Sequence, residues 1–272
     1  MSGEERPPHA VLVRSPEKFS APKVAGVLAK RAKAPALDFI PAARRAWGIA
    51  AESLPAAEAE ALAAELGAAG QESVAVPASL LESPPPPEGV QKAELSGDGF
   101  DVVSGRGNVP AARLSWTRLS VLCAAAVEVR ATTTVTEVKT PELGEQVARL
   151  GLSLAMGMPM LKKSEEVKRT VETRDRRLVC DLLFRDPARL LRLEAHDLDY
   201  SLLGAKKGYG AEQNFCLLLA ELSARAPRAL HGRGARALLG HRPVAEARYE
   251  SLDDLAREER WLAALASLGA AL

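Results

Sequence analysis

The chain has 272 residues, and 47% of them are hydrophobic, so it can bury a sizeable core as one large domain or two small ones. Its 36 Lys and Arg residues balance 35 Asp and Glu residues, and a net charge of +1 lacks the basic excess of a nucleic-acid-binding protein. No signal-peptide core and no run of ~20 apolar residues is present, so we expect a soluble, cytoplasmic protein without a transmembrane segment.

Residues 1–8 are expected to form a disordered lead-in, and residues 9–82 are expected to form a small α+β domain. Short β-rich runs predict its strands, and apolar residues at helical spacing between proline and glycine stops predict its helices. Ser20 is expected to cap the first helix. The predicted order is strand, helix, helix, strand, helix and strand, over residues 9–14, 20–35, 37–47, 48–54, 55–70 and 72–77.

Residues 83–89 read SPPPPEG and predict a domain boundary. Four consecutive prolines cannot enter a sheet or the interior of a helix, so they favour a stiff extended linker. A proline run is also typical of a ligand for SH3-type domains. The strands expected on both sides favour the linker.

The pattern after residue 89 changes to the alternation of β-strands. Ser96-Gly97-Asp98-Gly99 predicts a hairpin turn, and residues 105–108 predict a second turn. The helix expected at residues 211–226 carries an apolar stripe that includes Phe215 and Leu222. These features predict an antiparallel β-barrel-like domain with closing helices. Its strands are expected at 90–95, 100–104, 178–184 and 189–195, with one or two more within 113–129, and an insertion at 131–175 is expected to hold a short helix.

Residues 227–272 are expected to form a C-terminal helical extension. Residues 232–240 predict a short helix or turn, and residues 246–249 predict an edge strand. Ser251 starts a Ser-x-x-Asp pattern that is typical of a helix N-terminus. The apolar side of that helix is expected to comprise Leu252, Leu255, Trp261, Leu262 and Leu265.

Residues 9–80 resemble, in element order, the fold shared by the C-terminal domain of the ribosomal stalk protein and the protease adaptor ClpS. Recognition of N-terminal residues in the ClpS manner needs an Asn-Asp pair after the first strand and a histidine before the glycine that ends the second helix. This chain has Ser15-Pro16 and Arg45-Ala46-Trp47-Gly48 at those places, so the resemblance implies the fold without that pocket. A ferredoxin-like fold is the structural alternative.

Residues 90–226 resemble a bacterial pleckstrin-homology-like barrel, with a tryptophan-bearing strand at LSWTRLSVL and a closing helix. The whole chain also resembles bacterial two-domain proteins with similar segments around DYSLLG and NFCLLLAELSARAP, and that resemblance implies no activity. Both folds commonly serve as interaction platforms, so the resemblances imply a protein partner.

Glu194, His196, Asp197 and Asp199 form the densest titratable cluster. Carboxylates and an imidazole together can transfer protons or bind a metal ion. Strand alternation puts Glu194 and His196 on one face and the two aspartates on the other, and no second histidine lies at metal-ligand spacing. A strand that ends in a polar turn explains the cluster equally well.

Lys206, Lys207 and Tyr209 occupy a short glycine-flanked loop that is a candidate site for an anion, a partner or a lipid headgroup. A solvated turn is the alternative, because two lysines are fewer than a lipid-binding cluster carries. The segments His231-Gly-Arg-Gly and Gly240-His241-Arg242 are expected to be turns with exposed bases that can contact an anion.

No catalytic, metal or cofactor motif is recognisable, since GxSxG, GxxxxGK[ST] and a complete GxGxxG are missing. The cysteines Cys123, Cys180 and Cys216 lie far apart in apolar runs, which indicates buried thiols rather than disulfides or a zinc site. We therefore expect no catalytic residue, no metal ligand and no cofactor.

The favoured function is that of a non-enzymatic protein-binding, scaffold or adaptor protein. One alternative is a phospholipid or membrane-surface binding module, with peripheral membrane contact through Lys206 and Lys207. Another is an enzyme of unrecognised type that uses Glu194, His196 and Asp199. Neither a nucleic-acid partner nor a cofactor is expected.

Overall fold

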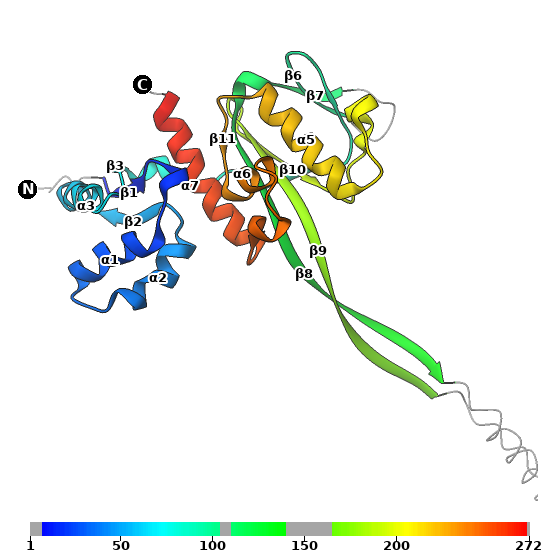
Figure 1. Ribbon diagram of the computed structural model, residues 1–272, viewed down its shortest axis with the longest axis horizontal. Coiled ribbons are helices and arrows are strands. Elements are labelled where there is room, and N and C mark those ends of the chain that lie inside the picture. Colours follow the sequence, from blue (N-terminus) through cyan, green and yellow to red (C-terminus); the bar gives the residue numbers. More distant parts are fainter. Residues whose placement is uncertain (1–6, 104–109, 140–164, 271–272) are drawn as a thin grey trace, which may run out of the picture. The chain divides into compact units, whose positions relative to one another are not determined.

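The computed structural model describes residues 7–103, 110–139 and 165–270. It forms two compact units, one with residues 1–128 and 176–272 and the other with residues 129–175. Helices and mostly antiparallel sheets make up the described residues (Figure 1), and the predicted α+β class is confirmed.

The first part of the chain folds in the predicted order of strands and helices. Its elements are β1 (His9–Val13), α1 (Ala21–Ala32), α2 (Ala36–Arg45), β2 (Ile49–Leu54), α3 (Ala56–Ala68) and β3 (Ser73–Pro77), with 3-10 turns at Pro16–Lys18 and Ala78–Leu81. The three strands form an antiparallel sheet of order β2-β1-β3. The central strand β1 is an apolar run because both of its faces are buried, and the consecutive residues Val11 and Leu12, on opposite faces, are each 0% exposed.

Ser20 precedes α1 as expected, but its side chain makes no capping hydrogen bond. Its backbone N–H donates to Oε1 of the buried Gln71 over 2.7 Å. The Gln71 amide also donates to the carbonyl of Lys18 over 3.0 Å. The Gln71 side chain therefore stabilises the N-terminus of α1. The expected cap by the Ser20 side chain is wrong.

The second part of the chain contains two further sheets. Its strands are β4 (Glu88–Val90), β5 (Ala93–Leu95), β6 (Gly99–Val103), β7 (Pro110–Ser115), β8 (Leu119–Lys139), β9 (Glu165–Phe184), β10 (Arg189–Glu194), β11 (Leu230–His231) and β12 (Arg248–Tyr249). One sheet has the order β11-β8-β9-β10-β4, with β12 also pairing with β8, and the other has the order β5-β6-β7. The predicted hairpin turn at Ser96–Gly99 joins β5 to β6.

The expected barrel is wrong, because none of the sheets closes on itself among the described residues. The strands expected in one barrel divide between two sheets. In the larger sheet, β4, β11 and β12 run parallel to their neighbours and are only two or three residues long. Such short strands at the edges cannot continue the hydrogen-bonded ladder far enough to close it.

Helices cover both faces of the larger sheet (Figure 1). They are α5 (Ala211–Arg225), α6 (Arg233–Leu239) and α7 (Leu252–Ala270), with 3-10 turns at Trp116–Arg118, Tyr200–Lys206 and Val244–Ala247. The stripe of α5 is confirmed, since Phe215 and Leu222 are buried with Leu122 and Leu182 of the sheet. The opposite face of the sheet shares a core with α7 and the N-terminal sheet.

Helix α7 begins as the sequence predicts, because the Ser251 hydroxyl accepts the backbone N–H of Asp254 over 3.2 Å. Leu255, Trp261, Leu262 and Leu265 are buried. Leu252 is 37% exposed, so its expected place in the apolar stripe is wrong. It occupies the first position of α7.

Residues 82–87 have no regular structure, and β4 begins inside the predicted linker at Glu88. The domain boundary at residues 83–89 stays a prediction. The turn at 105–108 and the short helix within 141–160 lie outside the described residues. Among the residues that are described, no helix has the length and apolar character needed to span a membrane.

Candidate functional site

The predicted acidic cluster is only partly brought together. Glu194 ends β10 and lies 3.5 Å from Nη1 of Arg177. Asp197 follows in a turn and lines a cavity with Glu194, whereas His196 is exposed and Asp199 is not part of that lining. The predicted split of the cluster between two faces is wrong, because strand alternation stops at Glu194.

Asp199 has a local structural role. Its carboxylate accepts the backbone N–H of Ser201 over 2.9 Å and the Ser201 hydroxyl over 3.0 Å. These two hydrogen bonds lower the pKa of Asp199. It therefore caps the turn at Tyr200–Lys206.

The cavity beside Glu194 and Asp197 has a volume of about 340 Å³. Its other charged lining residues are Lys92 and Arg192, and the rest is formed by residues 89–91, Val102 and Val103. Two acidic and two basic residues line the cavity, so its charge favours neither an anionic nor a cationic ligand.

Two buried carboxyl groups, those of Asp181 and Glu259, lie near Arg192. Arg192 faces Asp181 across the β9–β10 ladder, and its guanidinium holds both carboxylate oxygens, with Nε 2.8 Å from Oδ1. Glu259 of α7 is 1% exposed, and its Oε1 has no hydrogen-bond partner among the described residues. Burial, and then the charge of Asp181, raise the pKa of Glu259 well above its usual range. The pair therefore retains a proton that solvated carboxylates would release.

Glu258 forms a second buried network with Tyr249 and the start of α6. It accepts the backbone N–H of Arg233 over 2.7 Å and the hydroxyl hydrogen of Tyr249. The Tyr249 oxygen in turn accepts the N–H of Gly234 over 3.1 Å. Burial raises the pKa of Glu258 and the pKa of Tyr249. These bonds fix the place where α6 starts.

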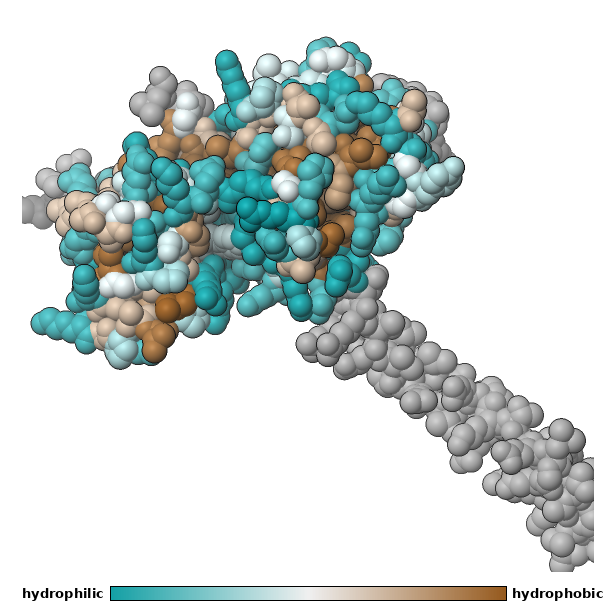
Figure 2. Space-filling view, in the orientation of Figure 1, coloured by the Kyte–Doolittle hydropathy of each residue, from teal (hydrophilic) through white to brown (hydrophobic). Residues whose placement is uncertain are grey.

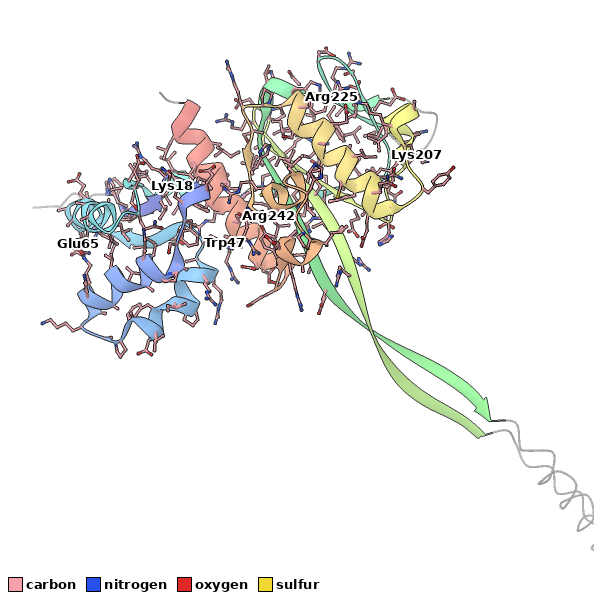
Figure 3. The ribbon with its side chains drawn as sticks, in the orientation of Figure 1. Lys18, Trp47, Glu65, Lys207, Arg225 and Arg242 are labelled. Carbon is pink, nitrogen blue, oxygen red and sulfur yellow. The ribbon has the colours of Figure 1, made fainter. Side chains whose placement is uncertain are left out.

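Three arginines converge on another cavity, of about 420 Å³, which we call the arginine cavity. Its lining comprises Glu17, Arg233, Arg236, Ala237, Arg242 and Glu246. Figure 2 shows a strongly hydrophilic surface where Figure 1 places α6, and Figure 3 labels Arg242, which follows α6, and Trp47, which follows α2. Two of these arginines belong to the segments that the sequence indicates as exposed bases.

The predicted basic loop carries less free charge than its sequence suggests. Lys206 forms an ion pair with Glu221 of α5. Tyr209 is fully exposed. Figure 3 labels Lys207, whose backbone N–H donates to the Gly204 carbonyl over 3.2 Å. Binding by this loop stays a prediction.

The cysteines are unpaired thiols, of which Cys123 and Cys180 are buried and Cys216 is partly buried. Burial raises the pKa of all three thiols. Within the described ranges, no three His, Cys, Asp or Glu side chains are grouped so that they could hold a metal ion.

Two features of the sequence could have indicated the buried acids. Glu258 and Glu259 follow the apolar Leu255 by three and four positions and precede the apolar Leu262 by four and three positions. This helical spacing puts both glutamates on the buried stripe of α7. Arg192 lies opposite Asp181 once the turn between the two strands is known. Arg236 had no distinguishing signal, because its role depends on Pro16, which is 220 positions away.

A scan of protein-family models, a search of curated proteins and a search of solved structures each gave no match for this chain. The ClpS-like and pleckstrin-homology-like resemblances therefore stay predictions.

Proposed function

We propose that this chain is a non-enzymatic protein-binding protein of the scaffold or adaptor kind, and that the outer parts of β8 and β9 are its binding element. The supporting observation is the length of these strands. They have 21 and 20 residues, whereas strands in globular proteins usually have about 5–6. Residues 129–139 of β8 and 165–175 of β9, which we call the β8–β9 ribbon, belong to the second compact unit.

Both β8 and β9 extend beyond the last residues with which β12 and β10 pair. Along β8, the last partner residue in β12 pairs with Val127, and along β9, the pairing with β10 reaches only Val179. Over the remaining described lengths, β8 and β9 are neighbours only of each other (Figure 1).

A ribbon of two strands is marginally stable alone in water. Each of its outer edges offers unpaired N–H and C=O groups to a further strand. Strand addition is a common way of binding an extended segment of a partner, because the main chain supplies affinity and alternate side chains supply specificity. The protein partner expected from the sequence therefore has a suitable binding element in the β8–β9 ribbon.

The test compares the full chain with a variant in which an Asn-Gly turn replaces residues 129–175. Thermal unfolding and circular dichroism first establish that the variant folds. Affinity capture from a lysate of the source organism then compares the proteins that each form retains. We expect a partner that the full chain retains reproducibly and that the shortened chain loses. Retention of the same partner by both forms would remove the ribbon from the proposal, and a full chain that retains no partner would contradict the scaffold function itself.

A further inference from the structure

The three guanidinium groups of the arginine cavity come from one short stretch of chain. Arg233 and Arg236 are three positions apart on α6 and share a face of the helix, and Arg242 follows in the next loop. The cavity volume of about 420 Å³ lies in the range of small-molecule sites. None of its lining residues belongs to the β8–β9 ribbon.

Arg233 is held in place before any ligand arrives. Its guanidinium lies 4.7 Å from the ring centroid of Tyr249 and 5.2 Å from that of Trp47, and it donates to the carbonyl of Arg248. The Trp47 indole is fixed in turn by Asp254, whose backbone carbonyl accepts its N–H over 3.0 Å. A cation fixed in this way loses little conformational entropy when it binds an anion.

Arg236 has an unused donor. Its Nη2 donates to the carbonyl of Pro16 over 3.2 Å, but its Nη1 is buried and has no hydrogen-bond partner among the described residues. Oε1 of Glu17 lies 3.5 Å from Nη1, which makes an ion pair without hydrogen-bond geometry. Nη1 therefore has a donor available for an acceptor that replaces Glu17 beside it.

The acids beside the arginines are weakly held. The Glu17 side chain is 69% exposed, and Glu246, which accepts from Nη1 of Arg242 over 3.2 Å, is 48% exposed. Ion pairs of this kind contribute little because water screens them. His231 adds no charge, because burial and the nearby Arg236 lower its pKa. Three cations therefore face two carboxylates that an incoming anion can displace.

We propose that the arginine cavity binds the phosphate group of a small phosphorylated molecule. A phosphomonoester has three terminal oxygens and close to two negative charges at neutral pH. Guanidinium groups on several sides can each donate to a different oxygen, and arginine forks match phosphate geometry. A carboxylate has only two oxygens and one charge, so it would use fewer of the available donors.

The experiment is isothermal titration calorimetry of the full chain with inorganic phosphate and with glycerol 3-phosphate. Glycerol and acetate serve as probes that lack the phosphate group. We expect saturable binding of both phosphate compounds, no binding of glycerol, and weaker binding of acetate. Arg236→Gln should weaken glycerol 3-phosphate binding at least about tenfold, because a hydrogen bond to a charged group is lost. Arg228→Gln changes an exposed arginine outside the lining and should leave the affinity unchanged.

Two further variants keep the test decisive if Arg236→Gln fails to fold. Arg242 is 66% exposed, so Arg242→Gln should fold normally and still weaken binding. Glu17→Gln removes a competing carboxylate and should strengthen binding severalfold, a gain that damage to the fold would not produce. A wild-type chain that binds neither phosphate compound would overturn the proposal. It would also be overturned if Arg242→Gln and Glu17→Gln left the affinity unchanged.

Discussion

Glu259 is a buried residue whose protonation should affect stability. Burial, and then Asp181, raise its pKa well above the usual value of 4.5. Between that value and the raised pKa, the unfolded chain releases a proton that the folded chain keeps, so the free energy of unfolding falls as the pH rises. Glu259→Gln removes this titration and keeps the size of the side chain. We expect the wild type to lose more stability than the variant as the pH rises from 5 to 8, because only the wild type has this titration.

Thermal unfolding at several pH values measures this difference. The control is Glu60→Gln, because Glu60 is exposed on α3 and its variant should follow the wild-type curve. Parallel curves for Glu259→Gln and wild type would contradict a retained proton on Glu259.

Arg192 and Arg189 form a matched pair of contacts on one strand. Both hold a carboxylate through two hydrogen bonds, but Asp181 is fully buried whereas the Glu88 side chain is 50% exposed. Arg192→Leu leaves a buried charge without its partner and should cost about 3–5 kcal/mol. Arg189→Leu should cost less than about 1 kcal/mol, because water replaces the lost contact. Urea denaturation measures both values, and equal losses would show that burial does not distinguish them.

At the scale of elements, α7 docks on the N-terminal sheet through Trp261. The indole N–H donates to the carbonyl of Val13 over 2.9 Å, and the ring covers Gly48 so closely that a Cβ atom there would lie 1.9 Å from Cε2. Gly48→Ala should therefore destabilise the protein by about 1–3 kcal/mol or more. Gly26→Ala, in α1, meets no atom within 4 Å and should stabilise it by about 0.5–1 kcal/mol. Chemical denaturation of the two variants should give opposite signs, and a neutral Gly48→Ala would contradict this packing.

Individual elements were predictable because their signals are local. The stripe through Phe215 and Leu222 and the Ser251 start of α7 depend on residues within a few positions of one another. Closure of a barrel depends on how far edge strands extend, and the sequence does not distinguish a two-residue β11 from a longer strand. The sequence indicated the arginines of this cavity only as two separate basic turns, at residues 231–234 and 240–242. The geometry of the cavity depends on a contact between α6 and Pro16, which the sequence does not indicate.

For the whole molecule, one hydrophobic core joins both sides of the proline-rich segment. Buried residues of β1, α1 and α3 share a cluster with Trp261, Leu262 and Leu265 of α7. Polar contacts also cross the segment, since Arg260 donates to the carbonyl of Leu81 over 2.7 Å and pairs with Glu52 over 2.8 Å. A proline run indicates an extended backbone, but it does not indicate whether distant residues complete the core of the preceding domain.

This shared core predicts that residues 1–82 do not fold as an isolated fragment. Without α7, the sheet would expose the side of its core that Trp261 and Leu262 cover. We expect the fragment to show poor dispersion of its amide signals and no cooperative thermal transition. The control is the full chain cut at a protease site placed within residues 83–87, whose two pieces should remain associated in size-exclusion chromatography. A fragment that unfolds cooperatively on its own would instead establish residues 83–89 as a domain boundary.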